Sequence, residues 1–327
     1  MSRILVTPQL LHNAKGEYYD ILTAAGCEVV WPTVRESDLR GEVLAANLKG
    51  ISGVLAGGEP YTPEILRGAK LRAISRSGVG YDSVDVPTAV ELGVAVTITP
   101  GTNEHSVAEQ ALALVLAVYR GVVSRDAEVR TGKWVRQPLW RLAGRTIGLV
   151  GLGRIGRAMV PRAIGLGLRV IAYDPFPDRE FAALHGVTLV PLDELFASSD
   201  IVSLHLPATA ETRDLINRRT LGLMRRDAVL INTSRGGLVD EDALVEALAT
   251  GRLRGAGLDV FKVEPLPLSS PLLKLDNVVF APHMGGQDEE SSAAMFRMAA
   301  ECLAQLVTNK WPEGCVVNEQ IRPGWKW

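Results

Sequence analysis

The stretch Ile147-Gly148-Leu149-Val150-Gly151-Leu152-Gly153-Arg154-Ile155-Gly156 decides the fold of this chain. An apolar run ends there in glycines spaced Gly-x-Gly-x-x-Gly, and the residues that follow read as a helix. Gly151 allows a tight strand-to-helix turn, Gly153 leaves room for a pyrophosphate to approach the backbone, and Gly156 lets helix and strand pack closely. The free N–H groups of the helix N-terminus then point at the phosphates. The stretch therefore predicts a dinucleotide-binding turn.

A carboxylate follows at the spacing that such a site requires. The next expected strand, residues 169–173, ends at Asp174, about 20 residues past the middle glycine. There a carboxylate accepts hydrogen bonds from the adenosine ribose hydroxyls. Its charge would repel a 2′-phosphate, and Pro175 stands where a phosphate-binding arginine would be expected, so the pattern favours NAD over NADP. The weaker alternative is a structural turn followed by an unrelated surface aspartate.

Length and composition limit the class of protein. At 327 residues the chain is too long for one typical core and predicts two domains. Its 47% hydrophobic and 22% charged residues are typical of globular proteins. The net charge is −2, with 35 basic and 37 acidic residues well mixed, so we expect neither a nucleic-acid partner nor a membrane partner.

The cysteines and apolar stretches indicate a compartment. Cys27, Cys302 and Cys315 are odd in number and form no Cys-x-x-Cys pair, so we expect no metal site and no disulfide scaffold. The first residues enter a strand directly, leaving no room for a signal peptide. The longest apolar stretch, 111–119, is too short to span a bilayer. These features predict a cytoplasmic protein.

Strands alternate with helices along the chain. Strands are expected at 3–7, 27–31, 53–56, 71–75 and 94–98, then at 147–150, 169–173, 201–207, 228–232, 255–260 and 278–280. Helical patterns between them, such as 10–25 and 37–48, imply parallel pairing with helices on both faces. A strongly apolar helix, 104–121, is expected to connect two domains.

We therefore predict an α/β fold with two Rossmann-like doubly wound parallel-sheet domains. The nucleotide-binding domain is inserted into a smaller, flavodoxin-like catalytic domain, because strands precede the glycine motif and the helix after Gln287 is expected to return to them. The expected catalytic or substrate domain comprises residues 1–101 plus 288–327, and the expected NAD-binding domain comprises residues 102–287.

Three polar residues follow strand ends in the second half: Arg235, Glu264 and His283. The carboxyl ends of parallel strands converge on one crevice, so all three could face one substrate. Histidine can take the proton of a secondary alcohol near neutral pH, and a carboxylate can fix its tautomer. An arginine fork can hold a substrate carboxylate. The nicotinamide would carry the hydride.

A glycine-bearing loop, Arg76-Ser77-Gly78-Val79-Gly80, follows the expected strand 71–75. Its backbone N–H groups could bind a small carboxylate, because ligands bind at the carboxyl ends of parallel strands. For Arg76 a strand-end salt bridge is an equally good interpretation.

These motifs resemble those of the D-isomer-specific 2-hydroxyacid dehydrogenases over nearly the whole chain. The similarity rests on the glycine motif, on Asn232-Thr233-Ser234-Arg235-Gly236-Gly237-Leu238-Val239-Asp240, on Gly257-Leu258-Asp259-Val260-Phe261 with Glu264-Pro265, and on Pro282-His283. The resemblance implies the two-domain arrangement, NAD as the cofactor, and a homodimer built largely on the nucleotide domain.

The resemblance also implies residue roles. His283 would be the acid/base, Glu264 its partner and Arg235 the substrate anchor, while Asp259 would contact the nicotinamide carboxamide. The expected cofactor contacts are Gly151, Gly153, Arg154, Ile155, Gly156, Asp174, His205, Pro207, Thr212, Thr233, Ser234, Asp259 and Gly285. The expected substrate contacts are Arg76, Ser77, Gly78, Val79 and Gly80.

The substrate stays open between two branches of the family. The loop at 76–80 is similar to that of 3-phosphoglycerate dehydrogenases, where a basic residue helps to hold the substrate. The sequence ends near residue 327, so the carboxyl-terminal regulatory domain of many such enzymes is expected to be absent. Glyoxylate and hydroxypyruvate reductases share almost every other motif and are the alternative.

Two further functions deserve comparison. An NAD-sensing binding protein, such as the corepressors that share this fold, is disfavoured because all three catalytic residues are present. Formate dehydrogenase is disfavoured because that branch has glutamine in place of Glu264. For Trp134 and Trp140, core packing and an interface arm are both open, and Trp325 and Trp327 of the tail could cover an apolar patch on either subunit.

Overall fold

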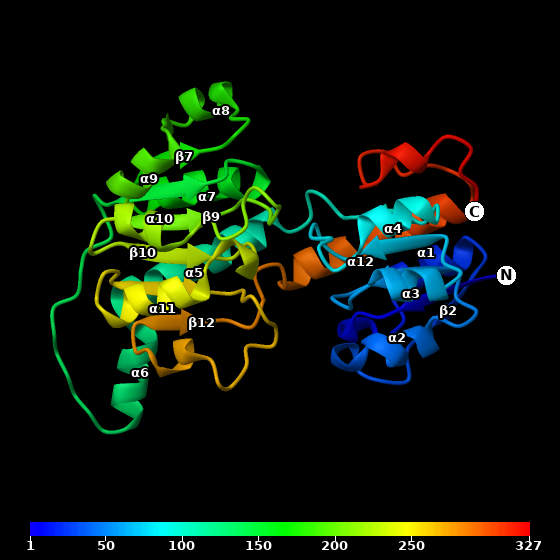
Figure 1. Ribbon diagram of the computed structural model, residues 1–327, viewed down its shortest axis with the longest axis horizontal. Helices are drawn as coiled ribbons and strands as arrows, with labels where there is room; N and C mark the ends of the chain where they lie inside the picture. The colour runs from blue at the N-terminus through cyan, green and yellow to red at the C-terminus, as the bar shows by residue number, and fades with distance from the viewer. The chain divides into compact units, whose positions relative to one another are not determined.

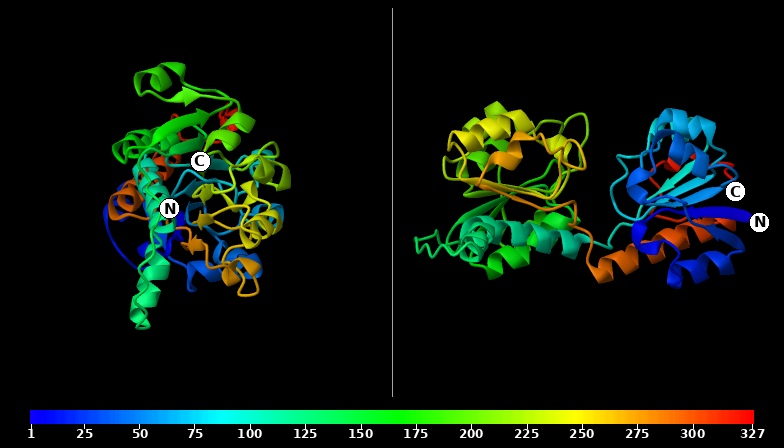
Figure 2. Two further views of the ribbon diagram at one scale, coloured as in Figure 1. Left: turned by 90° about the vertical axis from the view of Figure 1, so that its left-hand side faces the viewer. Right: turned by 90° about the horizontal axis from the view of Figure 1, so that it is seen from below.

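A computed structural model describes residues 1–327. The chain divides into two units, the first made of Met1–Asn103 with Asp288–Trp327 and the second of Glu104–Gln287. Each unit contains one parallel sheet with helices on both faces (Figures 1 and 2). The predicted α/β class with two doubly wound parallel sheets is confirmed.

The first unit has a five-stranded sheet in the order β2-β1-β3-β4-β5. The strands are β1 (Ser2–Val6), β2 (Cys27–Val30), β3 (Gly53–Ala56), β4 (Ala73–Arg76) and β5 (Ala95–Thr97). Alternate residues of a strand face opposite sides. In β1, Ile4 and Val6 pack with α1 (Glu17–Ala24) and α12 (Glu289–Val307). Leu5 packs on the other side with α2 (Gly41–Asn47), α3 (Pro63–Gly68) and α4 (Val86–Glu91).

The helix predicted over 10–25 is wrong at its start. A short 3₁₀ helix, Gln9–Leu11, comes first, and α1 begins only at Glu17. Asn13 between them has φ +55, which a continuous right-handed helix cannot contain. Gly16 then stands at the N-cap of α1, so the chain restarts its helix there.

The C-terminal tail packs on the first unit of its own chain. The indole N–H of Trp327 donates to Ser2 Oγ at 2.7 Å, and that of Trp325 donates to the carbonyl of Gly93 at 2.9 Å. A Cβ added to Gly53 would lie 2.8 Å from the Trp327 ring, so the strand is in close contact with the tail. Of the two patches that sequence left open for the tail, the tail covers the one on its own subunit.

The second unit has a seven-stranded sheet in the order β12-β11-β10-β9-β6-β7-β8. Its strands are β6 (Thr146–Val150), β7 (Arg169–Tyr173), β8 (Thr188–Leu189), β9 (Ile201–Leu204), β10 (Val229–Asn232), β11 (Gly255–Leu258) and β12 (Val278–Phe280). The strand order reverses between β6 and β9, which is where such sheets bind ligands. The two residues of β8 are too few for a periodic pattern, and this strand was not predicted.

Helices cover both faces of this sheet (Figure 2). On one face α5 (Glu104–Arg120) and α7 (Arg154–Gly165) share a core with β6, and on the other lie α9 (Leu192–Ser198), α10 (Arg218–Leu223) and α11 (Glu241–Ala249). The remaining helices are α6 (Val122–Arg130) and α8 (Arg179–Leu184). No single helix is long and apolar enough to cross a membrane, although α5 and α6 together, bent by 59°, reach the required length and composition.

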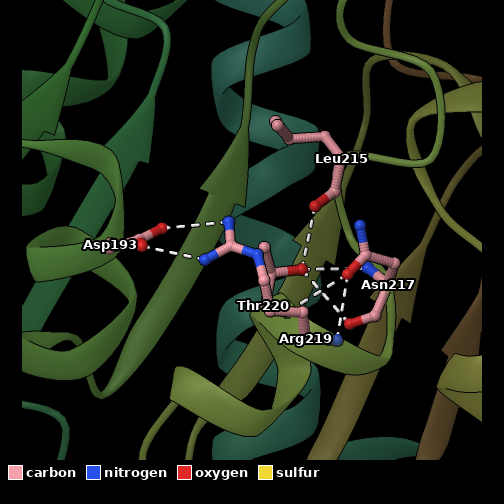
Figure 3. Close-up of polar contacts among 5 residues, drawn as sticks. All are labelled: Asp193, Leu215, Asn217, Arg219 and Thr220. Carbon is pink, nitrogen blue, oxygen red and sulfur yellow. Dashed lines mark hydrogen bonds and ion pairs between the residues drawn. The ribbon is translucent and has the colours of Figure 1, made fainter.

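Local hydrogen bonds fix the helices on the second face. Helix α10 starts with a capping box, in which the Asn217 side chain accepts from the Thr220 N–H and the Thr220 hydroxyl accepts from the Asn217 N–H (Figure 3). Arg219 then reaches α9 and contacts both carboxylate oxygens of Asp193, at 2.8 and 3.1 Å. These contacts hold α9 and α10 together beside the sheet.

Candidate active site

The glycine turn lies at the carboxyl end of β6, and each of its glycines is required for a separate reason. Gly151 has φ +107, and a Cβ there would lie 2.8 Å from the backbone of His205. A Cβ on Gly156 would lie 2.2 Å from the carbonyl oxygen of Gly151, so helix α7 could not approach the strand. A Cβ on Gly153 would meet nothing within 4 Å. The space beside Gly153 is therefore open to a ligand.

The N-terminus of α7 faces this open space. Its N-cap is Gly153, and no side chain caps the helix. The N–H groups of the first turn are therefore free of side-chain partners, which makes the helix end a site for a diphosphate.

Asp174 fixes the turn from the neighbouring strand. One carboxylate oxygen accepts the N–H of Leu152 at 2.7 Å, and the other accepts the N–H of Phe176 at 2.8 Å. Each oxygen retains a second lone pair, so the carboxylate can still accept hydroxyl hydrogen bonds. The predicted ribose contact is compatible with this geometry and stays a prediction.

Three predicted cofactor residues follow β9. The N–H of His205 donates to the carbonyl of Val150 at 2.8 Å, and its ring lies 3.0 Å from the hydroxyl of Ser203. Burial lowers the pKa of His205 to about 4, so the ring is neutral at neutral pH. Thr212 donates its hydroxyl to the carbonyl of Pro207 at 2.7 Å, which closes the loop after this strand.

The loop after β10 contains a buried polar atom that tests whether the site fits a cofactor. The hydroxyl of Thr233 is buried and has no hydrogen-bond partner in the protein. Its neighbour Ser234 is held by its hydroxyl on the carbonyl of Leu206 and by its N–H on the side chain of Asn232. A buried hydroxyl without a partner is costly, so the residues present fit a bound cofactor that accepts or donates there.

Asp259 acts on the loop that presents His283. Its two carboxylate oxygens accept the N–H groups of Met284 and Gly285, both at 2.8 Å. Its carbonyl accepts the N–H of His283 at 2.8 Å. His283 itself has φ +56, a left-handed conformation that costs on the order of 1 kcal/mol for a residue with a side chain. The three hydrogen bonds hold the histidine in that conformation.

Glu264 and His283 form a hydrogen-bonded pair. The distance from Glu264 Oε2 to His283 Nδ1 is 2.7 Å, and Glu264 Oε1 accepts the N–H of Phe261 at 2.9 Å. Burial by itself raises the pKa of Glu264, but the hydrogen bond and charge of His283, the Phe261 N–H and the charge of Arg235 together lower it. The carboxylate is thus ionised, so Nδ1 donates to it and Nε2 is the atom left to exchange a proton.

Arg235 lies close enough to this pair for its charge to act on Glu264. One guanidinium N–H donates to the carbonyl of Ser234 at 2.7 Å. The next residue, Gly236, packs directly on the backbone of Phe261, since a Cβ there would lie 1.9 Å from its carbonyl carbon. The structure thus brings Arg235, Glu264 and His283 together at the carboxyl ends of β10, β11 and β12.

The loop at 76–80 belongs to the first unit and lies at the carboxyl end of β4. Arg76 donates from Nε to the carbonyl of Gly80 at 3.1 Å, while its Nη1 is buried without a partner. Ser77 donates both its N–H and its hydroxyl to Ala56, each at 2.9 Å. Gly78 has φ +152 and its carbonyl accepts the N–H of Thr99 at 3.0 Å. Val79 has no side-chain role in these contacts.

Two residues near these loops were missed by sequence reasoning. Asn232 bridges the loop after β10, accepting from Ser234 and donating to the carbonyl of Arg235 at 2.8 Å. The sequence feature that could have identified Asn232 is its position as a polar last residue of an otherwise apolar strand. Glu59 is fully buried in the first unit, and its Oε1 accepts the hydroxyls of Thr7 and Tyr61, both at 2.6 Å. Burial raises its pKa above the usual range, and no motif marked it.

The sequence profile of the D-isomer specific 2-hydroxyacid dehydrogenase, NAD binding domain, matches residues 112–285, over half of the chain. The chain belongs to this family. It is thus an NAD-binding oxidoreductase of the D-2-hydroxyacid dehydrogenase class, and the predictions of family and cofactor are confirmed.

The proteins similar to this dehydrogenase are named for three different substrates. A glyoxylate reductase of Korarchaeum cryptofilum is 44% identical over 81% of this chain and 82% of its own length. A D-3-phosphoglycerate dehydrogenase of Methanocaldococcus jannaschii is 38% identical over 97% of this chain, which spans only 59% of that relative. The D-lactate dehydrogenase of Aquifex aeolicus, solved with NAD and lactic acid, has a TM-score of 0.85 at 26% identity and covers 97% of this chain and 99% of its own.

Proposed function

We propose that the protein transfers a hydride between NAD and a D-2-hydroxy acid or the corresponding 2-keto acid. The single observation that carries the proposal is the Glu264–His283 pair, held at 2.7 Å beside Arg235 at the mouth of a dinucleotide-binding sheet. In this proposal the second unit binds NAD through the glycine turn, Asp174 and the loop of Thr233. The first unit contributes residues 76–80 to substrate binding.

The roles follow from charge and geometry. In the oxidation of the alcohol, His283 Nε2 accepts the hydroxyl proton while Nδ1 stays hydrogen-bonded to Glu264. The carboxylate stabilises the imidazolium that forms, and Arg235 donates to the substrate carboxylate and to the oxygen that becomes the carbonyl. When bound, NAD would supply the hydride acceptor. In the reverse direction the imidazolium returns the proton.

We further propose 3-phosphoglycerate as the first candidate substrate. The buried Nη1 of Arg76 is a donor without a partner, and a phosphate oxygen would satisfy it. Similarity to a D-3-phosphoglycerate dehydrogenase over 97% of the chain agrees with this choice. The second candidate is glyoxylate or hydroxypyruvate, because a glyoxylate reductase is 44% identical over 81% of the chain.

A substrate panel tests these proposals. We expect NADH oxidation with at least one of 3-phosphohydroxypyruvate, hydroxypyruvate, glyoxylate and pyruvate, and oxidation of the D-isomer but not the L-isomer in reverse. Arg76→Gln should lower kcat/KM for the phosphorylated acid about tenfold more than for the others, since a charged hydrogen bond is worth about 1.5–3 kcal/mol. Equal losses would reject the phosphate assignment. No turnover of any acid would favour an NAD-sensing binding protein.

The proposal includes a homodimer in the cytoplasm. Helix α6 and the segment after it expose Val122, Val123, Val129, Trp134 and Val135, with Trp134 79% exposed. Apolar side chains gathered on one segment support an interface there. The free state of all three cysteines supports a reducing compartment. Light scattering on the purified protein should give twice the chain mass, and Trp134→Ser should lower it.

A further inference from the structure

A cavity of about 570 Å³ lies at the amino edge of the seven-stranded sheet, where β6 and β7 begin. The glycine turn follows the last residue of β6, so the cavity lies at the opposite end of the same strand. Four arginines and one aspartate line it: Arg141, Arg145, Arg169, Arg225 and Asp200. None of these residues belongs to the candidate active site.

The positive charge of this cavity exceeds what the protein itself neutralises. Asp200 Oδ1 lies 3.3 Å from Arg145 and 3.4 Å from Arg225, and its other oxygen accepts the N–H of Thr146 at 2.9 Å. Arg141 and Arg169 have no carboxylate within 4.0 Å. Asp200 is the one acidic residue among four arginines that line the cavity, so the lining carries about three formal positive charges in excess.

The backbone under these arginines is cross-linked by hydrogen bonds. The N–H of Arg169 donates to the carbonyl of Arg145 at 2.8 Å, and that of Gly144 donates to Gly167 at 2.8 Å. The Arg145 guanidinium also stacks 5.0 Å from the ring centre of Trp140. Arg145 is therefore held in place before an anion binds, and a cation fixed in advance loses less entropy on binding.

A purely structural role explains only part of this arrangement. Two arginines are enough to neutralise and orient Asp200, and Arg145 and Arg225 already do so. Arg141 and Arg169 contribute no ion pair to the fold, yet like-charged groups around one cavity repel one another. An anionic occupant with several oxygens removes that repulsion and can accept bidentate hydrogen bonds from the guanidinium forks.

We propose that this amino-edge cavity binds a small polyanion that carries two or more phosphate or carboxylate charges. A volume of about 570 Å³ is within the range of small-molecule sites. The shared chemistry is a group of anionic oxygens, and the phosphate and carboxylate sources are separated by the probes used. The site is distinct from the glycine turn, which lies at the opposite end of β6 and shares no residue with the cavity.

Calorimetric titration of the full chain with inorganic pyrophosphate and with citrate, in KCl of matched ionic strength, tests the proposal. We expect one polyanion per chain to bind, and Arg141→Ala with Arg169→Ala to weaken the affinity at least tenfold. Arg226→Ala is the control for each single variant, Arg141→Ala and Arg169→Ala, because it also removes one positive charge, beside Arg225, but does not line the cavity. Binding of pyrophosphate alone assigns phosphate, and binding of both probes assigns a general polyanion site.

Three results would overturn the proposal. One is the absence of binding by either probe at low millimolar concentration. Another is a misplaced loss of affinity: the Arg226→Ala control loses as much affinity as the cavity variants, or Arg154→Ala at the glycine turn loses affinity while the double variant does not. The last is a change in the oligomeric mass of the double variant with no change in polyanion affinity, which would assign the arginines to carboxylates of a second copy. Circular dichroism of each variant checks that it is folded.

Discussion

The carboxyl and amino edges of the seven-stranded sheet differ in how their charged side chains are paired. At the carboxyl edge, Glu264 is paired with His283, and Asp259 accepts two backbone N–H groups. At the amino edge, one carboxylate, Asp200, faces four arginines, and two of those have no acidic partner. Both edges are polar, but only the amino edge collects more positive charges than its acidic residue can pair.

This difference indicates how each edge is prepared for its ligand. Proton transfer requires one atom in one position, so hydrogen bonds fix His283 in a left-handed backbone conformation. Anion binding requires several positively charged donors close together, which the four arginines of the amino edge supply. At the carboxyl edge the buried hydroxyl of Thr233 also has no hydrogen-bond partner in the protein. A ligand there would need to supply one hydrogen bond and not a set of charges.

The largest effect should come from breaking the prepared proton site. His283→Ala removes the only proton acceptor held at this edge by Glu264, and general acid–base catalysis is worth about 10²–10⁴-fold, so we expect turnover to fall by about 10³-fold. NADH binding, measured by fluorescence, should change less than about threefold. Arg226→Ala, at the far end of the sheet, is the control for nonspecific damage. An equal loss of NADH affinity in His283→Ala would contradict the assignment.

The next effect concerns stability and pH. His205 has a pKa of about 4 in the folded state against 6.5 when exposed, so the unfolded state binds the proton first as pH falls. Its contribution to stability is complete above pH 6.5 and is lost between pH 6.5 and 4. The difference at low pH is about 3 kcal/mol, at about 1.4 kcal/mol for each pKa unit.

Urea denaturation of wild type and His205→Gln at pH 7.5, 5.5 and 4.5 measures this difference. Because glutamine does not titrate, the variant should gain on the wild type as pH falls. A constant offset between the two proteins at every pH would reflect only the lost contact with Ser203 and would contradict the lowered pKa.

Sequence predicted the fold and the family because their signals are local. The spacing of Gly151, Gly153 and Gly156 is sufficient to predict a strand-turn-helix geometry. The structure gives each glycine the expected close contact or open space. Apolar runs separated by helical patterns were sufficient for a parallel sheet. The error at 10–25 arose because helical periodicity continued across Asn13, although asparagine readily adopts the left-handed backbone found there.

The site was predicted only to the level of which residues follow which strands. That Arg235, Glu264 and His283 share an edge follows from parallel topology, but their roles stay predictions until kinetics test them. The hydrogen bonds from the Asp259 carboxylate to the loop of His283 depend on side-chain rotamers, which a sequence pattern does not encode. The same holds for the unpaired hydroxyl of Thr233. The amino-edge arginines come from three separated segments with no motif, so only coordinates could bring them together.

The smallest effect should come from the adenosine end of the carboxyl edge. Asp174→Asn keeps an oxygen that can accept the Leu152 N–H but removes the negative charge. We expect NAD to bind about tenfold more weakly, since a hydrogen bond to a charged group is worth about 1.5–3 kcal/mol, while NADP should bind no worse because the repulsion of its 2′-phosphate is relieved. The ratio of the two dissociation constants, measured by fluorescence titration, therefore narrows. If the ratio is unchanged while both affinities fall, Asp174 acts through the glycine turn that it supports and not on the ribose. In that case the charge of Asp174 stabilises only the protein's own turn. Unlike Asp174, the amino-edge arginines would then carry the charges that act on a ligand and not on the fold.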